Sequence, residues 1–248
     1  MKYLLTSAGI KNTSIHNALI DLLGKPIAEC SALCIPTAVY GHPQVTPDRA
    51  WRFISGQQPE TPMCELGWKS LGALELTALP SIDAERWVSW VRETDVLLVN
   101  GGDTLYLCYW MRQSGLADLL PSLHAVWVGL SAGSMVMTPR IGEDFVQWKP
   151  PSGGDETLGV VDFSIFPHLD NPDLPENTLS NAERWAGGIQ GPAYAIDDQT
   201  AIKVVDGTVE VVSEGHWKRF APVSQNEGDF QSLSVVDSER RNEETLGH

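Results

Sequence analysis

The chain has 248 residues, of which 42% are hydrophobic and 20% charged, and its formal net charge is −15 at pH 7. This length and composition predict a single globular domain over residues 1–221, large enough to contain an active site, and a polar tail over residues 222–248. The acidic balance argues against nucleic acid or an anionic membrane as partner. No run approaches the roughly 18 apolar residues of a membrane span, and residues 1–9 do not have the pattern of a signal peptide. We therefore expect a cytoplasmic protein.

Four cysteines occur, and they show no CxxC pair and no histidine at zinc spacing. Cys34 and Cys108 lie in apolar runs, where a buried, reduced thiol is expected. We therefore expect no metal site.

Strand and helix patterns alternate through the first half of the chain. Apolar strands are predicted at 1–9, 32–39, 71–79, 95–100 and 126–130, and helices at 15–23, 82–92 and 104–120. Gly24-Lys25-Pro26 should end the first helix, and Ser81 should cap the second. The segment 41–69 has four prolines and weak periodicity, which is typical of a loop or lid. The alternation predicts an α/β fold with a mainly parallel sheet covered on both faces.

Shorter strands follow at 160–166, 193–196, 200–205 and 208–212. Asp206-Gly207 is a strong signal for a hairpin turn between the last two. No internal repeat and no interdomain linker is evident.

The apolar run 126–130 leads into Gly129-Leu130-Ser131-Ala132-Gly133, a Gly-x-Ser-x-Gly pentapeptide followed by small residues. This is the pattern of a nucleophile elbow, in which a sharp strand-to-helix turn presents the serine hydroxyl. The motif has only three fixed positions, so companions elsewhere in the chain must support it.

A second glycine-rich junction, Asn100-Gly101-Gly102-Asp103, should lie at the same edge of a parallel sheet. An amide of Gly101 or Gly102, with that of Ala132, could hold an oxyanion, because glycine lets a substrate approach the backbone closely. The alternative is a plain tight turn in which Asp103 caps the next helix.

His168 follows a strand directly and is the best candidate for a general base. Asp197 and Asp198 also follow a strand, and only one of two adjacent acids should face the histidine. The order Ser131, His168, Asp198 differs from that of α/β-hydrolases, for which Ser131, Asp198 and His216 would be the available set.

Together these segments resemble the peptidase E (aspartyl dipeptidase) family of serine peptidases, which is related to cyanophycinases. The matching pieces occur in the family's order and are Val99–Thr104, Gly129–Ser134, Phe166–His168 and Ile196–Ile202. The resemblance implies a three-layer sandwich like that of class I glutamine amidotransferases (flavodoxin-like). It also implies Ser131 as nucleophile, His168 as base and Asp198 as the acid, with no metal or organic cofactor.

The implied activity is hydrolysis of small peptides, dipeptides of the Asp-X type among them, and a homodimer is one candidate assembly. The family's substrate-binding arginine falls near Ser180, however, and Arg184 lies one helical turn further on. An esterase or amidase with the same triad, and a non-catalytic amidotransferase-like scaffold, are the alternative functions.

Overall fold

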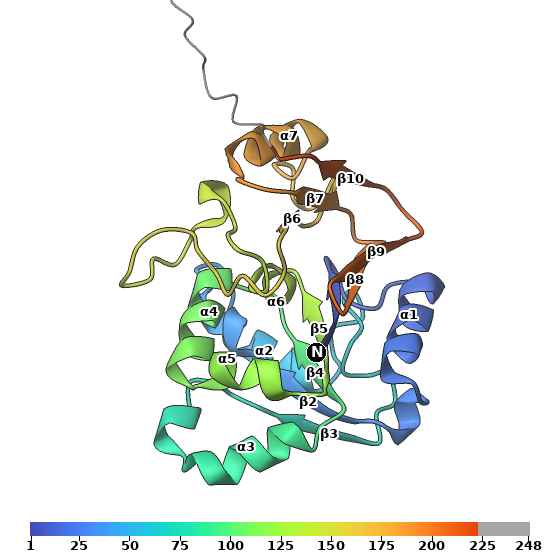
Figure 1. The fold of residues 1–248 in the computed structure, drawn as a ribbon, viewed down its shortest axis with the longest axis vertical. Coiled ribbons are helices and arrows are strands. Elements are labelled where there is room, and N and C mark those ends of the chain that lie inside the picture. Colours follow the sequence, from blue (N-terminus) through green and yellow to red (C-terminus); the bar gives the residue numbers. More distant parts are fainter. Residues whose placement is uncertain (223–248) are drawn as a thin grey trace, which may run out of the picture.

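The computed structural model describes residues 1–222, and a mostly parallel sheet forms its centre (Figure 1). Seven strands lie in the order β3-β2-β4-β5-β1-β8-β9. The strands from β3 to β1 run parallel, whereas β8 and β9 are antiparallel to their neighbours. The strand bounds are β1 Lys2–Thr6, β2 Ser31–Ile35, β3 Ser70–Ala73, β4 Val96–Val99, β5 Val126–Leu130, β8 Thr200–Val205 and β9 Thr208–Ser213.

Helices cover both faces of this sheet, because successive strand residues point to opposite sides. Leu4 and Leu98 pack in one buried cluster with α1, whereas Leu5 and Leu97 pack in a second cluster with α3, α4 and α5. Figure 1 shows α1 on one side of the sheet and α4 and α5 on the other. The predicted three-layer α/β fold is therefore confirmed. The helix bounds are α1 Thr13–Leu23, α2 Asp48–Ile54, α3 Ala84–Arg92, α4 Thr104–Gln113, α5 Leu116–Leu119, α6 Ala132–Met135 and α7 Leu179–Gly188.

A second, smaller sheet was not predicted. It contains β6 Ser164–Phe166, β7 Ala193–Ile196 and β10 Trp217–Phe220, in the order β10-β7-β6. Helix α7 packs on it through Ala182, Trp185 and Ala186, and the unit lies at one end of the molecule (Figure 1). Two of its strands match the predicted strands at 160–166 and 193–196, although β6 begins only at Ser164. Strand β10 was not predicted, because four residues are too few for an alternating pattern to stand out.

Several element boundaries differ from the sequence prediction for local reasons. The expected helix over 104–120 is two helices, since Gly115 has a left-handed φ of 81° between them. Helix α3 is capped by Asp83, whose side chain accepts from the amide of Glu85, and not by Ser81. Apolar strands at 32–39 and 71–79 end early, at Ile35 and Ala73.

Other local predictions are confirmed. Gly24 ends α1 in a left-handed conformation, and Asp206-Gly207 turns β8 into β9. The predicted tail lies, apart from Pro222, outside the described residues. Within residues 1–222 no helix is long and apolar enough to cross a bilayer.

Candidate active site

Ser131 lies at the strand-to-helix turn between β5 and α6 with φ 49° and ψ −109°. Few residues other than glycine adopt such a φ, and a strained backbone of this kind is common at functional sites. The Ser131 amide donates to the carbonyl of Thr6 at 2.9 Å, which fixes the turn against β1. The backbone therefore has the geometry expected of a nucleophile elbow.

The two glycines of the pentapeptide are required by close backbone packing. A Cβ on Gly129 would overlap the carbonyl of Gly133, and a Cβ on Gly133 would overlap the carbonyl of Val99. The Gly133 carbonyl also accepts from the indole of Trp127 at 2.8 Å. The Gly-x-Ser-x-Gly pattern thus follows from the shape of this turn. Because α6 is a single turn, its macrodipole is small, and local N–H groups must provide most of any stabilisation of an anion.

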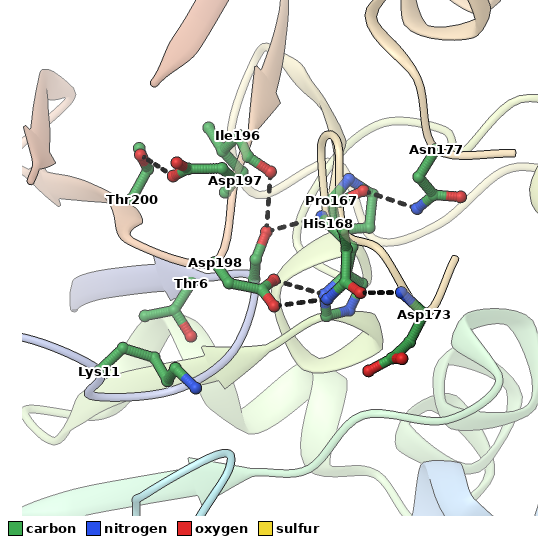
Figure 2. A network of polar contacts seen from close by, with 12 residues as sticks. Thr6, Lys11, Pro167, His168, Asp173, Asn177, Ile196, Asp197, Asp198 and Thr200 are labelled. Atoms are coloured by element: carbon green, nitrogen blue, oxygen red, sulfur yellow. Dashed lines mark hydrogen bonds and ion pairs between the residues drawn. The ribbon is translucent and has the colours of Figure 1, made fainter. Parts of the chain in front are cut away.

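His168 and Asp198 come together at the ends of the neighbouring strands β6 and β7, as Figure 2 shows. Nδ1 of His168 lies 2.7 Å from Oδ1 of Asp198, so Nδ1 carries the proton and Nε2 is left as the acceptor. The other carboxylate oxygen of Asp198 accepts from Nδ2 of Asn171 at 2.7 Å. His168 itself has a left-handed φ of 56°.

Asp197 points away from this pair and supports the neighbouring turn. Its Oδ1 accepts from the hydroxyl of Thr200 at 2.6 Å, and its Oδ2 accepts from the amide of His216 at 2.7 Å. The structure therefore places Asp198, and not Asp197, on His168. His216 contacts Asp197 and Asp170, so the α/β-hydrolase arrangement of Ser131, Asp198 and His216 does not occur.

The two predicted oxyanion junctions lie side by side, because β4 and β5 are neighbours. The Gly101 amide donates to its neighbour's side chain, Oδ1 of Asn100, at 2.9 Å. No described residue accepts from the amides of Gly102 and Ala132. Gly102 has a φ of 141°, and a Cβ there would overlap the backbone of Ala38. Gly102 is therefore better placed than Gly101 to donate to a substrate.

Asp103 caps helix α4, which is the alternative role that the sequence suggested for it. Its Oδ1 accepts from the amide of Tyr106 and its Oδ2 from the amide of Trp148, each at 2.8 Å. Burial raises the pKa of this carboxyl, although these amide hydrogen bonds oppose the shift. Asp103 also lines the cavity described next.

A cavity of about 700 Å³ joins most of the predicted residues, although the buried Ala132 is not among those that line it. Ser131, His168 and Asp198 all line it, together with Gly101, Gly102 and Asp103. The segment 41–69 forms part of the wall and contributes His42, Val45, Arg49, Gln58, Glu60 and Thr61. This segment is anchored, since the Ile10 amide donates to the carbonyl of Pro62 at 2.8 Å.

Arg184 does not belong to this cavity. Its side chain is 68% exposed on α7, where it bonds Asn181 and lies 4.0 Å from Asp144. The cationic lining residues are instead Lys11 and Arg49. No sequence pattern indicates a role for Lys11, which lies in a loop, or for Arg49, which lies in a segment with weak periodicity. Only the tertiary fold brings these two residues to the cavity.

The charges around the cavity set the protonation states of its groups. Burial opposes ionisation of Asp198, but the hydrogen bond and charge of His168, with Asn171 and Lys11, outweigh it and hold the pKa of this carboxyl below its usual range. Burial lowers the pKa of His42, and the charge of Asp103 opposes this shift. Within the described residues no group of three or more His, Cys, Asp or Glu side chains could hold a metal ion.

A strained serine at an elbow, a histidine–aspartate pair across the same cavity and amides free to donate together form the type of site found in serine hydrolases. Residues 3–212 match the family model of peptidase family S51, and the chain belongs to that family.

Two sequence relatives are also described as peptidases. The chain is 29% identical over 119 residues to an uncharacterised peptidase of Listeria monocytogenes, and 26% identical over 133 residues to one of Pasteurella multocida. These matches cover 45% and 50% of this chain, and 57% and 62% of those relatives, which is less than two thirds of their length.

Two crystal structures share the fold. One is a candidate peptidase E protein from Listeria monocytogenes, with TM-score 0.59, 20% identity and coverage of 86% of this chain and 98% of that one. The other is a peptidase from an acI-B1 actinobacterium, with TM-score 0.61, 18% identity and coverage of 90% and 95%.

Proposed function

We propose that this chain is a serine peptidase that hydrolyses small peptides through Ser131, His168 and Asp198. The observation that carries the proposal is the 2.7 Å contact between His168 Nδ1 and Asp198 Oδ1 in the cavity that Ser131 lines. This contact leaves the other imidazole nitrogen available as a base, and membership of peptidase family S51 supports peptide bonds as the target.

In the proposed mechanism, His168 takes the proton of the Ser131 hydroxyl as its oxygen attacks the peptide carbonyl. Asp198 orients the imidazole and stabilises its charged form. The amides of Gly102 and Ala132 donate to the oxyanion of the tetrahedral intermediate. His168 then protonates the leaving amine, and water activated by the same histidine hydrolyses the acyl-enzyme.

The cavity supports a short substrate with an acidic group. A volume of about 700 Å³ lies within the range of small-ligand sites and is adequate for a dipeptide. Lys11 and Arg49 offer positive charge to a substrate carboxylate, and Lys11 is held by the carbonyl of Glu60 at 2.7 Å. We therefore propose peptides of the Asp-X type as substrates, with Arg49 taking the place expected of an arginine on α7.

The test compares wild type with Ser131→Ala on a panel of Asp-X, Glu-X, Ala-X and Lys-X dipeptides and on simple acyl esters. Loss of the nucleophile should lower turnover by about 10⁴-fold or more. A serine-reactive phosphonate should label wild type at Ser131 and leave the variant unmodified, which mass spectrometry of peptides would detect.

Ser152→Ala is the matched control, since Ser152 is an exposed loop serine outside the cavity, and it should behave as wild type. Hydrolysis of esters without any peptide would contradict the peptidase assignment in favour of an esterase. Absence of both hydrolysis and labelling in wild type would contradict any catalytic role.

A further inference from the structure

His216 lies between two carboxylates just outside the cavity. Its Nδ1 is 3.0 Å from Oδ2 of Asp197, and its Nε2 is 3.0 Å from Oδ2 of Asp170. Its backbone amide also donates to Oδ2 of Asp197 at 2.7 Å. The side chain is 58% exposed and does not line the cavity, so His216 cannot act directly on a substrate bound there.

Each of these carboxylates lies next to a member of the proposed triad. Asp197 directly precedes Asp198 in the turn after β7. Asp170 follows His168 by two residues, and both have left-handed φ values, of 53° and 56°. Asn171, the next residue, donates to Asp198. His216 thus joins the loop that carries the base to the turn that carries the acid.

Backbone hydrogen bonds also hold the loop that follows His168. The amide of Leu169 donates to the carbonyl of Ile196 at 3.0 Å, and the amide of Asp170 donates to the carbonyl of Asn177 at 2.7 Å. Both residues with left-handed φ must nevertheless keep unfavourable conformations, which persist only when surrounding contacts hold them. The two ring nitrogens of His216 each lie 3.0 Å from one of the carboxylates, so a single side chain contacts both Asp197 and Asp170.

We infer that His216 is a positioning residue. By bridging Asp170 and Asp197, it keeps the imidazole of His168 and the carboxylate of Asp198 within hydrogen-bonding distance of each other. The inference rests on the proposed function, because the register matters only if His168 is the base. A base displaced by a fraction of an ångström loses alignment with the nucleophile while the substrate pocket is unchanged. The bridge should therefore affect turnover more than substrate binding.

The experiment replaces His216 by alanine and uses Lys218→Ala as the matched control. Lys218 lies in β10, two residues after His216, is 43% exposed and pairs with Glu183 of α7 at 2.6 Å, away from the loops of the triad. We expect His216→Ala to lower kcat about tenfold with KM changed less than about twofold, and Lys218→Ala to leave both unchanged. Melting temperatures should fall by similar amounts in the two variants.

Proton NMR gives a readout that does not depend on turnover. The proton that His168 donates to Asp198 should give a resolved downfield signal in wild type and Lys218→Ala, and a broadened or lost signal in His216→Ala. Asp170→Asn, which breaks the other end of the bridge, should reproduce this effect if His216→Ala fails to fold. The double variant Asp170→Asn/His216→Ala should lose no more than either single variant, because both remove one bridge.

The two proposals fail in different ways. A wild type that hydrolyses no peptide or ester would refute the proposed function, whatever His216 does. An unchanged His168 proton signal and unchanged kcat in His216→Ala would overturn the positioning role, even in an active enzyme.

Discussion

Asp197 and Asp198 are adjacent acids whose different surroundings give them different roles. Asp197 is buried and takes hydrogen bonds from Thr200 and from the amide of His216. Asp198 reaches into the cavity and takes hydrogen bonds from His168 and Asn171. Adjacent residues in a turn point to different sides, which is why only one of the pair can orient the histidine.

Replacing Asp198 by asparagine should lower kcat by about 10⁴-fold, because the amide no longer fixes the His168 tautomer with Nδ1 protonated. The variant should also change the dependence of stability on pH. The pKa of Asp198 is lower in the folded protein than in the unfolded chain. Its ionised form therefore stabilises the fold above about pH 4, and this contribution is lost as pH falls through the folded-state pKa.

Urea unfolding at pH 7, 5 and 3 would measure this effect. The difference in free energy of unfolding between wild type and Asp198→Asn should be largest at neutral pH and should shrink at pH 3. Asp118→Asn, at an exposed position of α5, is the control and should show little difference at any pH. A difference that grows as pH falls would contradict the assigned direction of the shift.

At the scale of elements, the prediction and the structure differ most in the segment 41–69. Its prolines and weak periodicity suggest a loop, yet it contains α2, which buries Ala50 and Phe53 and leaves Trp51 exposed. A helix of seven residues gives too few turns for its apolar face to be recognised in the sequence. The carbonyl of Arg49 accepts from the buried side chain of Gln58 at 3.1 Å, which ties α2 to the chain beyond it.

Helix α2 offers a test of substrate choice, because its two arginines differ in their relation to the cavity. Arg49 lines it, whereas Arg52 is exposed elsewhere on the same helix. Arg49→Ala should raise KM for Asp-X dipeptides by about 10- to 100-fold, the value of a hydrogen bond to a charged group, with a smaller effect on Ala-X. Arg52→Ala should match wild type. Equal loss on Asp-X and Ala-X would contradict recognition of a carboxylate by Arg49.

At the scale of the whole molecule, the proposed triad is divided between two sheets. Ser131 follows a strand of the large sheet, and His168 and Asp198 follow strands of the small one. The elbow could be predicted because close backbone packing requires glycine at both ends of its pentapeptide. His168 and Asp198 could be predicted because each follows a short apolar run that is typical of a strand. The small sheet, α2 and the charges at Lys11 and Arg49 depend on packing between distant segments, which leaves no local pattern.

Ser7, directly after β1, joins the two sheets. Its hydroxyl is fully buried, donates to the carbonyl of Ile196 at 3.0 Å and accepts from the amide of His168 at 2.9 Å. One side chain next to the large sheet thereby holds both His168 and the end of the strand that leads to Asp198. No motif in the sequence around Ser7 indicates that its hydroxyl would be buried between the two sheets.

Ser7→Ala should therefore weaken both stability and turnover. Removing the hydroxyl leaves the His168 amide without a partner, at a cost of about 1–3 kcal/mol in the free energy of unfolding, while the Ile196 carbonyl keeps its hydrogen bond from the Leu169 amide. Ser164→Ala is the matched control, because Ser164 is equally buried in β6 and donates to the carbonyl of Arg140 at 2.8 Å. Both variants should lose similar stability in urea. Only Ser7→Ala should lower kcat, by about tenfold or more, because, of the two hydroxyls, only that of Ser7 contacts His168. If kcat fell equally in the two variants, general loosening of the small sheet would explain the effect, and the specific tie through Ser7 would be wrong.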